Sequence, residues 1–449
     1  MSNLYSIALC NRTNQFKGLL VMKTKLSSRF WLALVLCSLI GQVAWVVENM
    51  YLNVFIYKMF AASAADISLM VSASAVAATV TTIFMGALSD KVGKRKIFIC
   101  AGYILWGISI FCFALIRTDV LGKMFPMVTS AAALGVSLTI IFDCLMTFFG
   151  STANDAAFNA WVTDSTDSTN RGAAEGINSM MPLVSILVVF GGFMAFDLNK
   201  QQSWTMIFII IGSVVLAIGV LAFFLVEDAP IEKSNENYLN NVIYGFRPST
   251  IKSNVPLYVT LITFIVFNIS IQIYMPYLII YYEVSLSMAN YVLVMAPAII
   301  LASVFTALWG KAYDKRGFEN AAMVTLILLA SGYIVLYLFR ATIPVFVGSL
   351  LMMSGYLSGM AMFGARIRDL TPEGYAGRLQ GVRIFSQVLV PGVVGPYIGK
   401  TILANAQMIT NNDGTQSFVP NANIFLGAFV AIIPVIIVVY GLKRKKDKA

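Results

Sequence analysis

Long apolar stretches alternate with short polar segments along the whole chain, and twelve of these stretches are long enough to cross a bilayer. A membrane-spanning helix needs about 20 mostly apolar residues, and its backbone hydrogen bonds must close within the span. The sequence therefore predicts an all-α membrane protein with twelve transmembrane helices. The predicted spans are residues 30–48, 66–89, 96–116, 139–163, 179–197, 205–226, 257–281, 288–312, 320–339, 343–365, 381–402 and 421–441.

A polar segment, residues 227–256, divides the spans into two groups of six. We expect residues 30–226 and 257–441 to form two pseudo-symmetric six-helix bundles joined by this segment as a cytoplasmic linker. Residues 1–29 and the basic residues 442–449 are expected to be cytoplasmic tails. Translation could start at Met1 or at Met22, which precedes a polar lead into the first span, and the sequence leaves both open.

The distribution of basic residues gives the orientation. Cytoplasmic loops carry an excess of Lys and Arg. With both termini inside, 25 of the 31 Lys and Arg residues fall in inside segments. An odd number of spans, or the opposite orientation, loses this asymmetry. The six on the outside are Lys58, Arg117, Lys123, Lys200, Arg340 and Lys400.

The fourth span has two interpretations. Hydropathy alone places it at 127–149, with Gly150 ending the helix and 151–170 forming a loop. We prefer 139–163, because polar and aromatic residues there repeat at steps of three and four, as on one helix face. A polar stripe on a membrane helix should face protein or a water-filled cavity. The stripe is Asp143, Thr147, Ser151, Asn154, Phe158 and Trp161, and beside it lie Thr152, Asp155 and Asn159.

Composition excludes several other classes of protein. Only 12% of residues are charged, against about 25% in soluble domains, and the mean hydropathy is +0.80. The net charge of +10 lies in short loops, so we expect no nucleic-acid partner. The chain has no histidine, no nucleophile paired with a base and no long soluble region, so we expect neither an enzyme nor a sensor, and no cofactor or metal. Five cysteines without metal-ligand spacing are expected to be free thiols: Cys10, Cys37, Cys100, Cys112 and Cys144.

The loop between the second and third spans has a complete Gly-x-x-x-Asp-basic-x-Gly-basic-basic pattern. Glycine permits a tight turn, and an acid at one helix end can cap the positive N-terminus of another helix across the interface between the halves. The pattern residues are Gly86, Asp90, Lys91, Gly93, Lys94 and Arg95. We expect these residues, Lys91 apart, to act in gating.

The pattern recurs in the second half. Gly310 to Gly317, with Asp314, lies 224 residues after the first copy, although the basic tail is incomplete. The other cytoplasmic loops repeat an Asp-x-Thr segment followed by arginine: Asp164 to Arg171, and Asp369 to Arg378. Repeats at matching places indicate duplication, and we add Asp314, Arg171, Asp369 and Arg378 to the expected gating residues.

The loop pattern resembles the signature of the major facilitator superfamily, and this resemblance covers the whole chain. The segments Asn154–Arg171 and Arg366–Gly381 also resemble loops of the glycoside–pentoside–hexuronide:cation symporters, the melibiose permease branch. The resemblance implies a sugar-binding aspartate in the fourth helix, here Asn154 or Asp155. It also implies alternating access between two halves.

This sequence departs from that branch at its ion-binding positions. The two acids expected in the second helix correspond to Ala78 and Thr82, and the lysine of the eleventh to Pro391 or Gly392. An acid expected in the first helix corresponds to Gln42. Sodium coupling of the branch's kind is therefore not expected, and a proton, another monovalent cation or no ion remains open.

Amides and aromatic rings in the first, fourth and seventh spans suit a neutral polar ring such as a sugar, which stacks on the rings and hydrogen-bonds to the amides. Tyrosines at the end of the seventh span could instead form an interfacial belt, and Glu48 could lie at the outer interface. The candidate substrate-binding residues are Gln42, Trp45, Asn49, Asn154, Asp155, Asn159, Trp161, Asn268, Gln272 and Tyr274.

We therefore expect a monomeric carrier in a bacterial cell membrane that imports a small polar solute, a sugar or glycoside among them, by alternating access. Asp155 is the first candidate for ion coupling, because an acid inside a membrane helix can exchange a proton between the two sides; Glu48 and Asp143 follow. Two alternatives stay open. One is drug or metabolite efflux by antiport, which the 22 methionines suit, and the other is an uncoupled uniporter.

Overall fold

The computed structural model describes residues 26–128, 130–167, 169–228, 244–288, 290–372, 376–411 and 414–446. Twelve helices in this part of the chain are long and apolar enough to cross a membrane. The predicted all-α, twelve-helix fold class is thus confirmed. The side chains of Asp314 and Arg378, both predicted to act in gating, lie outside what the structure describes.

Each half of the chain contributes six of these helices, several of them built from consecutive elements. The first half contains α2 (Ser28–Val46), η1 (Val47–Tyr51), α3 (Leu52–Phe60), α4 (Ala64–Val92), α5 (Arg95–Leu115), α6 (Thr118–Met124), α7 (Ala131–Gly150), η2 (Ser151–Phe158), α8 (Asn159–Asp164), α9 (Arg171–Phe193) and α10 (Gln201–Leu225). The second half contains α12 (Pro248–Ser253), α13 (Val255–Tyr274), η3 (Met275–Tyr277), α14 (Leu278–Ile280), η4 (Tyr281–Ser285), α15 (Val292–Leu338), α16 (Thr342–Leu370), α17 (Ala376–Ile384), η5 (Phe385–Leu389), α18 (Val390–Ile402), β1 (Met408–Thr410), β2 (Gln416–Phe418) and α19 (Asn423–Lys446).

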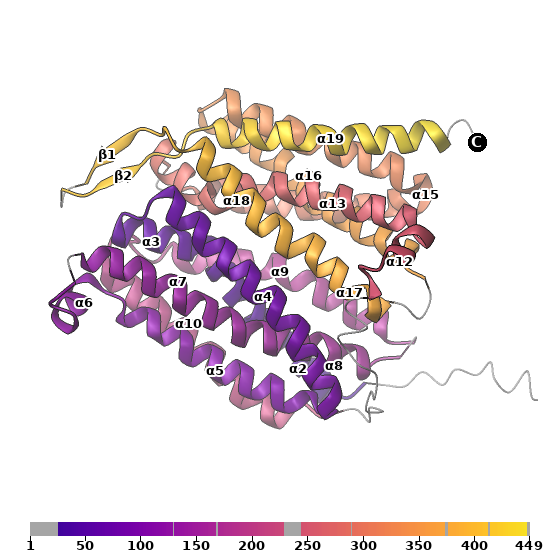
Figure 1. The fold of residues 1–449 in the computed structure, drawn as a ribbon, viewed down its shortest axis with the longest axis horizontal. Coiled ribbons are helices and arrows are strands. Elements are labelled where there is room, and N and C mark those ends of the chain that lie inside the picture. The colour runs from indigo at the N-terminus through magenta and orange to yellow at the C-terminus, as the bar shows by residue number, and fades with distance from the viewer. Residues whose placement is uncertain are drawn as a thin grey trace, which may run out of the picture.

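Figure 1 shows the first half, indigo to magenta, beside the second half, orange to yellow, with most helices running along one axis. Within the first half α5 packs on α10 and α2 on α9, and in the second half α13 packs on α18 and α19. Glycines let some helices approach closely. A Cβ added at Gly355 of α16 would lie 2.4 Å from the backbone nitrogen of Leu329, and one at Gly107 of α5 would lie 2.6 Å from that of Leu216.

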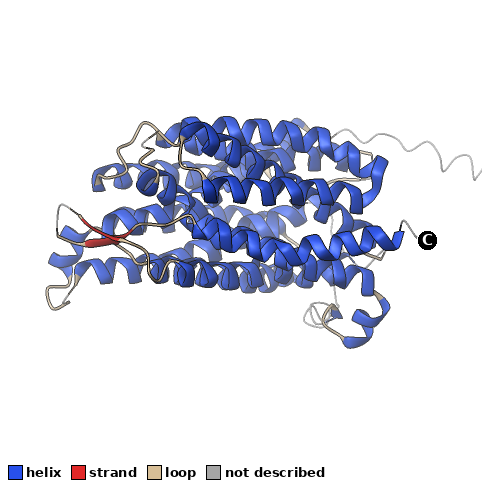
Figure 2. Cartoon of the chain, turned by 90° about the horizontal axis from the view of Figure 1, so that it is seen from above, coloured by secondary structure: helices blue, strands red, loops and turns tan. Residues whose placement is uncertain are grey.

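The two ends of the bundle differ. The end where α4 meets α5, residues 91–96, is called the basic-loop end below. Gly93, with φ of 70°, ends α4 in the left-handed conformation that glycine adopts easily. The opposite end carries the antiparallel pair β1–β2, in which Met408 pairs with Phe418, and is called the hairpin end. Figure 2 shows the hairpin at one end of the bundle and the described C-terminus at the other.

The fourth membrane helix is continuous from Ala131 to Asp164 through α7, η2 and α8. It begins before residue 139, where our prediction placed its start, and it continues past Gly150, so the alternative that Gly150 ends it is wrong. The hydropathy window at 127–149 and the polar stripe belong to one helix of 34 residues. Its middle, Ser151–Phe158, is a π-helical segment, a feature that occurs often at functional sites.

We predict from the distribution of basic residues that the basic-loop end is cytoplasmic. Single-cysteine variants at Gly317 and at Lys443 should then resist a membrane-impermeant maleimide added outside intact cells, whereas a cysteine at Asn411, beside the hairpin, should react. Permeabilised cells provide the control, because all three sites should react there. Labelling of Lys443→Cys from outside would contradict an even number of spans with both ends inside.

Candidate functional site

A cavity of about 480 Å³ lies between the two halves near the middle of the helices. Its lining comes from the first, second, fourth and fifth membrane helices of the first half and from the seventh, eighth, tenth and eleventh of the second. The lining includes six residues that the sequence marks as substrate-binding candidates, and all three acids that it marks for ion coupling: Gln42, Trp45, Asn49, Asp155, Asn268, Gln272, Glu48 and Asp143.

The first membrane helix presents Glu48 to this cavity because the π-helical turn η1 interrupts it there. Glu48 is 5% exposed. One of its oxygens, Oε1, accepts hydrogen bonds from the hydroxyls of Ser74 at 2.7 Å and Thr147 at 2.8 Å. The side chain therefore ties the first helix to the second and the fourth, and it does not lie at the outer interface.

The fourth membrane helix contributes two further acids. Asp143, 2% exposed, lies one turn from Thr147 on the same face. Asp155 is half-buried on η2, and its Oδ2 accepts a hydrogen bond from the Ser151 hydroxyl at 3.0 Å. Among the described residues that line the cavity, none is Lys or Arg. The cavity therefore holds three carboxyl groups without a basic residue beside them.

Two predicted binding residues near Asp155 do not line the cavity. Asn154 is buried and donates to the hydroxyl of Tyr103 at 2.8 Å, and Tyr103 in turn donates to the carbonyl of Cys37. Asn159 is exposed, and its amide donates to the backbone carbonyl of Asp155 at 3.3 Å. The π-helical segment changes the number of residues per turn. Within this segment Asn154 faces Tyr103, while the next residue, Asp155, lines the cavity.

The other two predicted binding residues that do not line the cavity are aromatic and serve in packing. Trp161 is buried, donates through its indole N–H to the carbonyl of Glu227 at 2.9 Å, and packs on Phe30 with ring centres 4.9 Å apart. Tyr274 is fully buried within the second half, where its ring lies 5.4 Å from that of Tyr333. The spacing of residues along a helix does not show which other part of the protein that face of the helix contacts.

Sequence reasoning missed several lining residues. Ser74 lies one turn before Ala78, a position that the resemblance singles out, so its polar character in the second span was a usable signal. Gln387 is a polar residue within the eleventh span and was equally visible. The methionines and Tyr356 gave no periodic signal, because apolar residues of this kind occur throughout the spans. The methionines that line the cavity are Met50, Met70, Met275, Met353 and Met360.

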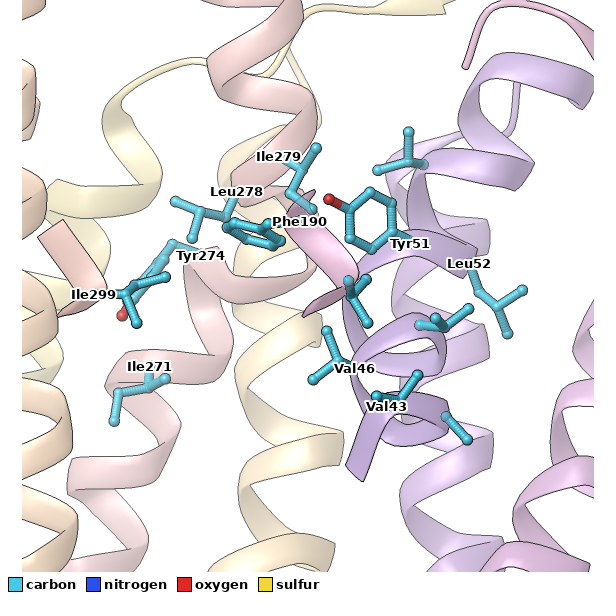
Figure 3. Close-up of a cluster of buried hydrophobic side chains, with 14 of the residues drawn as sticks. Val43, Val46, Tyr51, Leu52, Phe190, Ile271, Tyr274, Leu278, Ile279 and Ile299 are labelled. Carbon is cyan, nitrogen blue, oxygen red and sulfur yellow. The ribbon is translucent and has the colours of Figure 1, made fainter. Parts of the chain in front are cut away.

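At the hairpin end the cavity is closed by an apolar layer. Figure 3 shows Tyr51 and Phe190 of the first half beside Leu278 and Ile279 of the second. Tyr51 and Phe190 are fully buried, with ring centres 6.0 Å apart. Such a layer excludes water, so a solute in the cavity cannot leave past it in this conformation.

Polar contacts between the halves reinforce the closure. The hydroxyls of Tyr51 and Tyr291 are 2.8 Å apart. Lys58 and Glu283 form an ion pair at 2.7 Å, with side chains only 10% and 14% exposed. The Tyr57 hydroxyl donates to the carbonyl of Phe418 at 2.7 Å. These contacts hold the ends of the first and seventh helices and the hairpin together.

Towards the basic-loop end the fourth helix becomes accessible. Asn159 follows Asp155 by one turn and is exposed, as is Thr163 one turn further. Exposed polar side chains therefore follow the cavity residue Asp155 along the fourth helix toward this end. The conformation is closed at the hairpin end.

The signature loop at the basic-loop end is held by ion pairs within the first half. The Arg95 guanidinium pairs with Asp90 at 2.5 Å and with Asp164 at 2.9 Å, and also donates to Ser89. Ser89 in turn donates to the carbonyl of Gly86. In this conformation Asp90 pairs with Arg95, whose side chain is only 6% exposed. That Asp90 caps a helix across the halves stays a prediction.

The remaining gating candidates lie near the same end. Arg171 donates to the backbone carbonyls of Thr163 and Thr166 and so caps the end of the fourth helix. The Tyr313 hydroxyl donates to Asp369 in the second half. Lys94 is the residue that precedes α5. These contacts stabilise the loops, and whether they also act in gating stays a prediction.

Asp90→Asn is expected to reduce the transport rate several-fold while the protein still inserts and purifies. The variant removes a partly exposed ion pair, worth about 0.2–1 kcal/mol, and Arg95 keeps Asp164 as a partner. A change of this size suffices to bias an equilibrium between two conformations of similar free energy. Initial uptake rates in proteoliposomes, compared with those of Asp119→Asn at an exposed position of α6, measure the effect. Parental kinetics in Asp90→Asn would argue against gating.

The family model described as Major Facilitator Superfamily matches residues 31–396. Among solved structures, a mutant of the nucleoside transporter NupG is 13% identical with a TM-score of 0.68, covering 91% of this chain and 98% of that one.

Two further solved structures have the same fold. A bacterial homolog of the human lysosomal transporter Spinster, in an inward-facing and occupied conformation, is 15% identical with a TM-score of 0.67, covering 93% and 98%. The xylose transporter XylE from E. coli, partially occluded and inward open, is 15% identical with a TM-score of 0.65, covering 92% and 98%. No protein with a curated description matches the sequence.

Proposed function

This chain belongs to the Major Facilitator Superfamily, and we propose that it is a secondary active transporter that moves a small polar solute by alternating access. The observation that carries the proposal is the cavity of about 480 Å³ between the two halves, lined by amides and carboxyl groups. Ligand sites of this size combine a mostly apolar wall with a few polar groups that fix orientation. Asn268 and Gln272 from the second half face this space together with Gln42 and Asn49 from the first.

Closure at the hairpin end, with access from the basic-loop end as part of this proposal, fits alternating access. In such carriers the two halves rock around a site near the middle of the membrane. The layer at Tyr51 and Phe190 would open in the opposite conformation, while the basic-loop end would close. If that end is cytoplasmic, the conformation described here faces the cytoplasm.

Coupling to a proton is the second part of the proposal. Asp155 lines the cavity and can exchange a proton with solvent through the accessible end. Ser151, which donates to it, keeps the carboxyl in place. Import driven by a proton gradient follows if protonation at Asp155 favours solute binding on the outside.

The loops that resemble the glycoside–pentoside–hexuronide:cation symporters favour a sugar or glycoside as the solute. The similar solved structures include a xylose transporter and a nucleoside transporter. Their substrates are small hydroxylated molecules that would fit a cavity of this volume. We further propose that the protein acts as a monomer in a bacterial cell membrane.

Efflux is the second candidate function. Five methionines line the cavity beside Trp45 and Tyr356. Flexible thioether side chains adapt to irregular apolar ligands, which suits a carrier of amphipathic molecules. The methionines are Met50, Met70, Met275, Met353 and Met360.

Solute uptake by proteoliposomes tests the proposal. Purified protein would be reconstituted with and without a pH gradient, and offered radiolabelled pentoses, hexoses, glycosides and nucleosides. We expect one class to accumulate only with the gradient, and only in vesicles that contain the protein. Release of amphipathic dyes in exchange for protons, without uptake of any polar solute, would favour efflux instead. Flux without a gradient response would indicate a uniporter.

A further inference from the structure

Two carboxyl groups in the cavity have an oxygen with no hydrogen-bond partner. Oε2 of Glu48 and Oδ1 of Asp143 are both buried and unpaired. The two residues are 5% and 2% exposed, and both line the cavity. Buried polar atoms are nearly always hydrogen-bonded in native proteins, and a buried charge is usually paired. These two oxygens therefore point to a partner that binds beside them in the cavity.

The helices bring these acids to the same place. Asp143 and Thr147 are four residues apart on the fourth helix, a spacing that puts their Cβ atoms about 5–6 Å apart. The Thr147 hydroxyl donates to Oε1 of Glu48 at 2.8 Å, and the Ser74 hydroxyl lies 2.8 Å from that of Thr147. Both hydroxyls thus hold Oε1 of Glu48 in place and leave Oε2 without a partner, beside the helix that carries Asp143.

The charge of the cavity selects the kind of ligand. With Asp155, three carboxyl groups face the cavity, and the described residues lining it include no Lys or Arg. An unpaired buried charge is strongly unfavourable. A ligand with a positive charge would satisfy the free oxygens of Glu48 and Asp143 by charge-assisted hydrogen bonds. A neutral sugar would leave the two acids without a charge partner, so both would have to take up a proton.

The surroundings favour an organic cation over a metal ion. In the described part of the chain no three His, Cys, Asp or Glu side chains are arranged to hold a metal ion. The cavity volume of about 480 Å³ is many times that of one ion. The rings of Trp45 and Tyr356 line the same space, and Trp45 lies about one helical turn from Glu48. Aromatic faces attract organic cations. The amides Asn49 and Gln272 add groups that bind hydroxyls.

We propose that Glu48 and Asp143 bind the ammonium group of the transported solute, which is therefore a small polar amine. This inference rests on the proposed transport function and names the substrate class. The ammonium donates to Oε2 of Glu48 and Oδ1 of Asp143, while the hydroxyls of Ser74 and Thr147 orient Glu48. The amides of the cavity bind the polar remainder of the solute.

Matched ligand pairs test the proposal directly. The full-length protein in detergent would be titrated with glucosamine and glucose, and with ethanolamine and ethylene glycol. Quenching of tryptophan fluorescence, with Trp45 in the cavity wall, reports binding. We expect at least one amine to bind about tenfold or more tightly than its neutral partner. Glu48→Gln and Asp143→Asn should remove this preference, because each replaces a carboxylate by an amide of the same shape.

Controls separate the possible outcomes. Asp119→Asn, the same substitution at an exposed position of α6, should keep the preference for the amine, and a parental melting temperature shows that each variant is folded. Equal binding of both members of a pair would overturn the ammonium site while leaving a carrier of polar solutes intact. A response to sodium chloride alone, lost in Glu48→Gln, would overturn it in favour of an alkali-metal site. Binding of no member of any pair would count against the proposed function itself.

Discussion

Asp155→Asn is expected to abolish accumulation of solute against a gradient while exchange across the membrane survives. An aspartate within a membrane helix costs roughly 2.5–3.5 kcal/mol on insertion scales, and a side chain kept at that cost indicates a function. Asparagine has the same shape and can still accept the hydrogen bond from Ser151, so the helix should be preserved. Asparagine cannot exchange a proton, so a proton gradient can no longer drive the cycle.

Two transport assays on the same proteoliposomes measure this effect. Accumulation driven by a pH gradient should fall to the level of empty vesicles, whereas counterflow of labelled against unlabelled solute at equal pH should stay near the parental rate. Asp119→Asn provides the matched control outside the cavity. Accumulation at the parental level in Asp155→Asn would rule out this residue as the coupling site. Glu48 or Asp143 would then take its place.

The number and order of membrane helices could be read from the sequence because long apolar runs have few other stable solutions. The residues at which the helices end were harder to predict from the sequence. The first span was predicted to end at residue 48, but the helix continues to Phe60. Glu48, Asn49, Asn53 and Lys58 lower the hydropathy of that stretch. Glu48 and Lys58 have partners from elsewhere in the chain, Asn53 is buried, and Asn49 is exposed. Such shielding is a property of the folded protein, so the local sequence does not show it.

The same reasoning explains which binding candidates reach the cavity. Asn268 and Gln272 lie one turn apart on a regular helix, so their shared face followed from spacing. Asn154 depends on its partner Tyr103, 51 positions away in sequence, and on a π-helical segment that no pattern announced. The sequence identifies Glu48 as an acid in the first span. It does not show that Ser74 and Thr147 contact this acid, so the junction of three helices at Glu48 could not be predicted.

Lys58→Glu is expected to abolish transport and to open the hairpin end. Lys58 on α3 and Glu283 on η4 join the two halves through an ion pair at 2.7 Å that is nearly buried. Breaking a buried pair typically costs about 3–5 kcal/mol, and two facing carboxylates repel in addition. Since about 1.4 kcal/mol changes an equilibrium constant tenfold, even part of this cost moves most molecules out of the closed conformation. The double variant Lys58→Glu, Glu283→Lys restores an attractive pair with the same composition, and it should recover transport.

Accessibility of the cavity distinguishes this gate from simple loss of folding. In a cysteine-free background, Met50→Cys places a thiol in the cavity wall near the closed layer. A membrane-impermeant maleimide supplied at the hairpin end should label it slowly in the parent and in the charge-swapped double variant. Labelling should be fast in Lys58→Glu, because the halves separate there when like charges face each other. Slow labelling and full transport in Lys58→Glu would show that the apolar layer of Tyr51, Phe190, Leu278 and Ile279 closes this end without help from the ion pair.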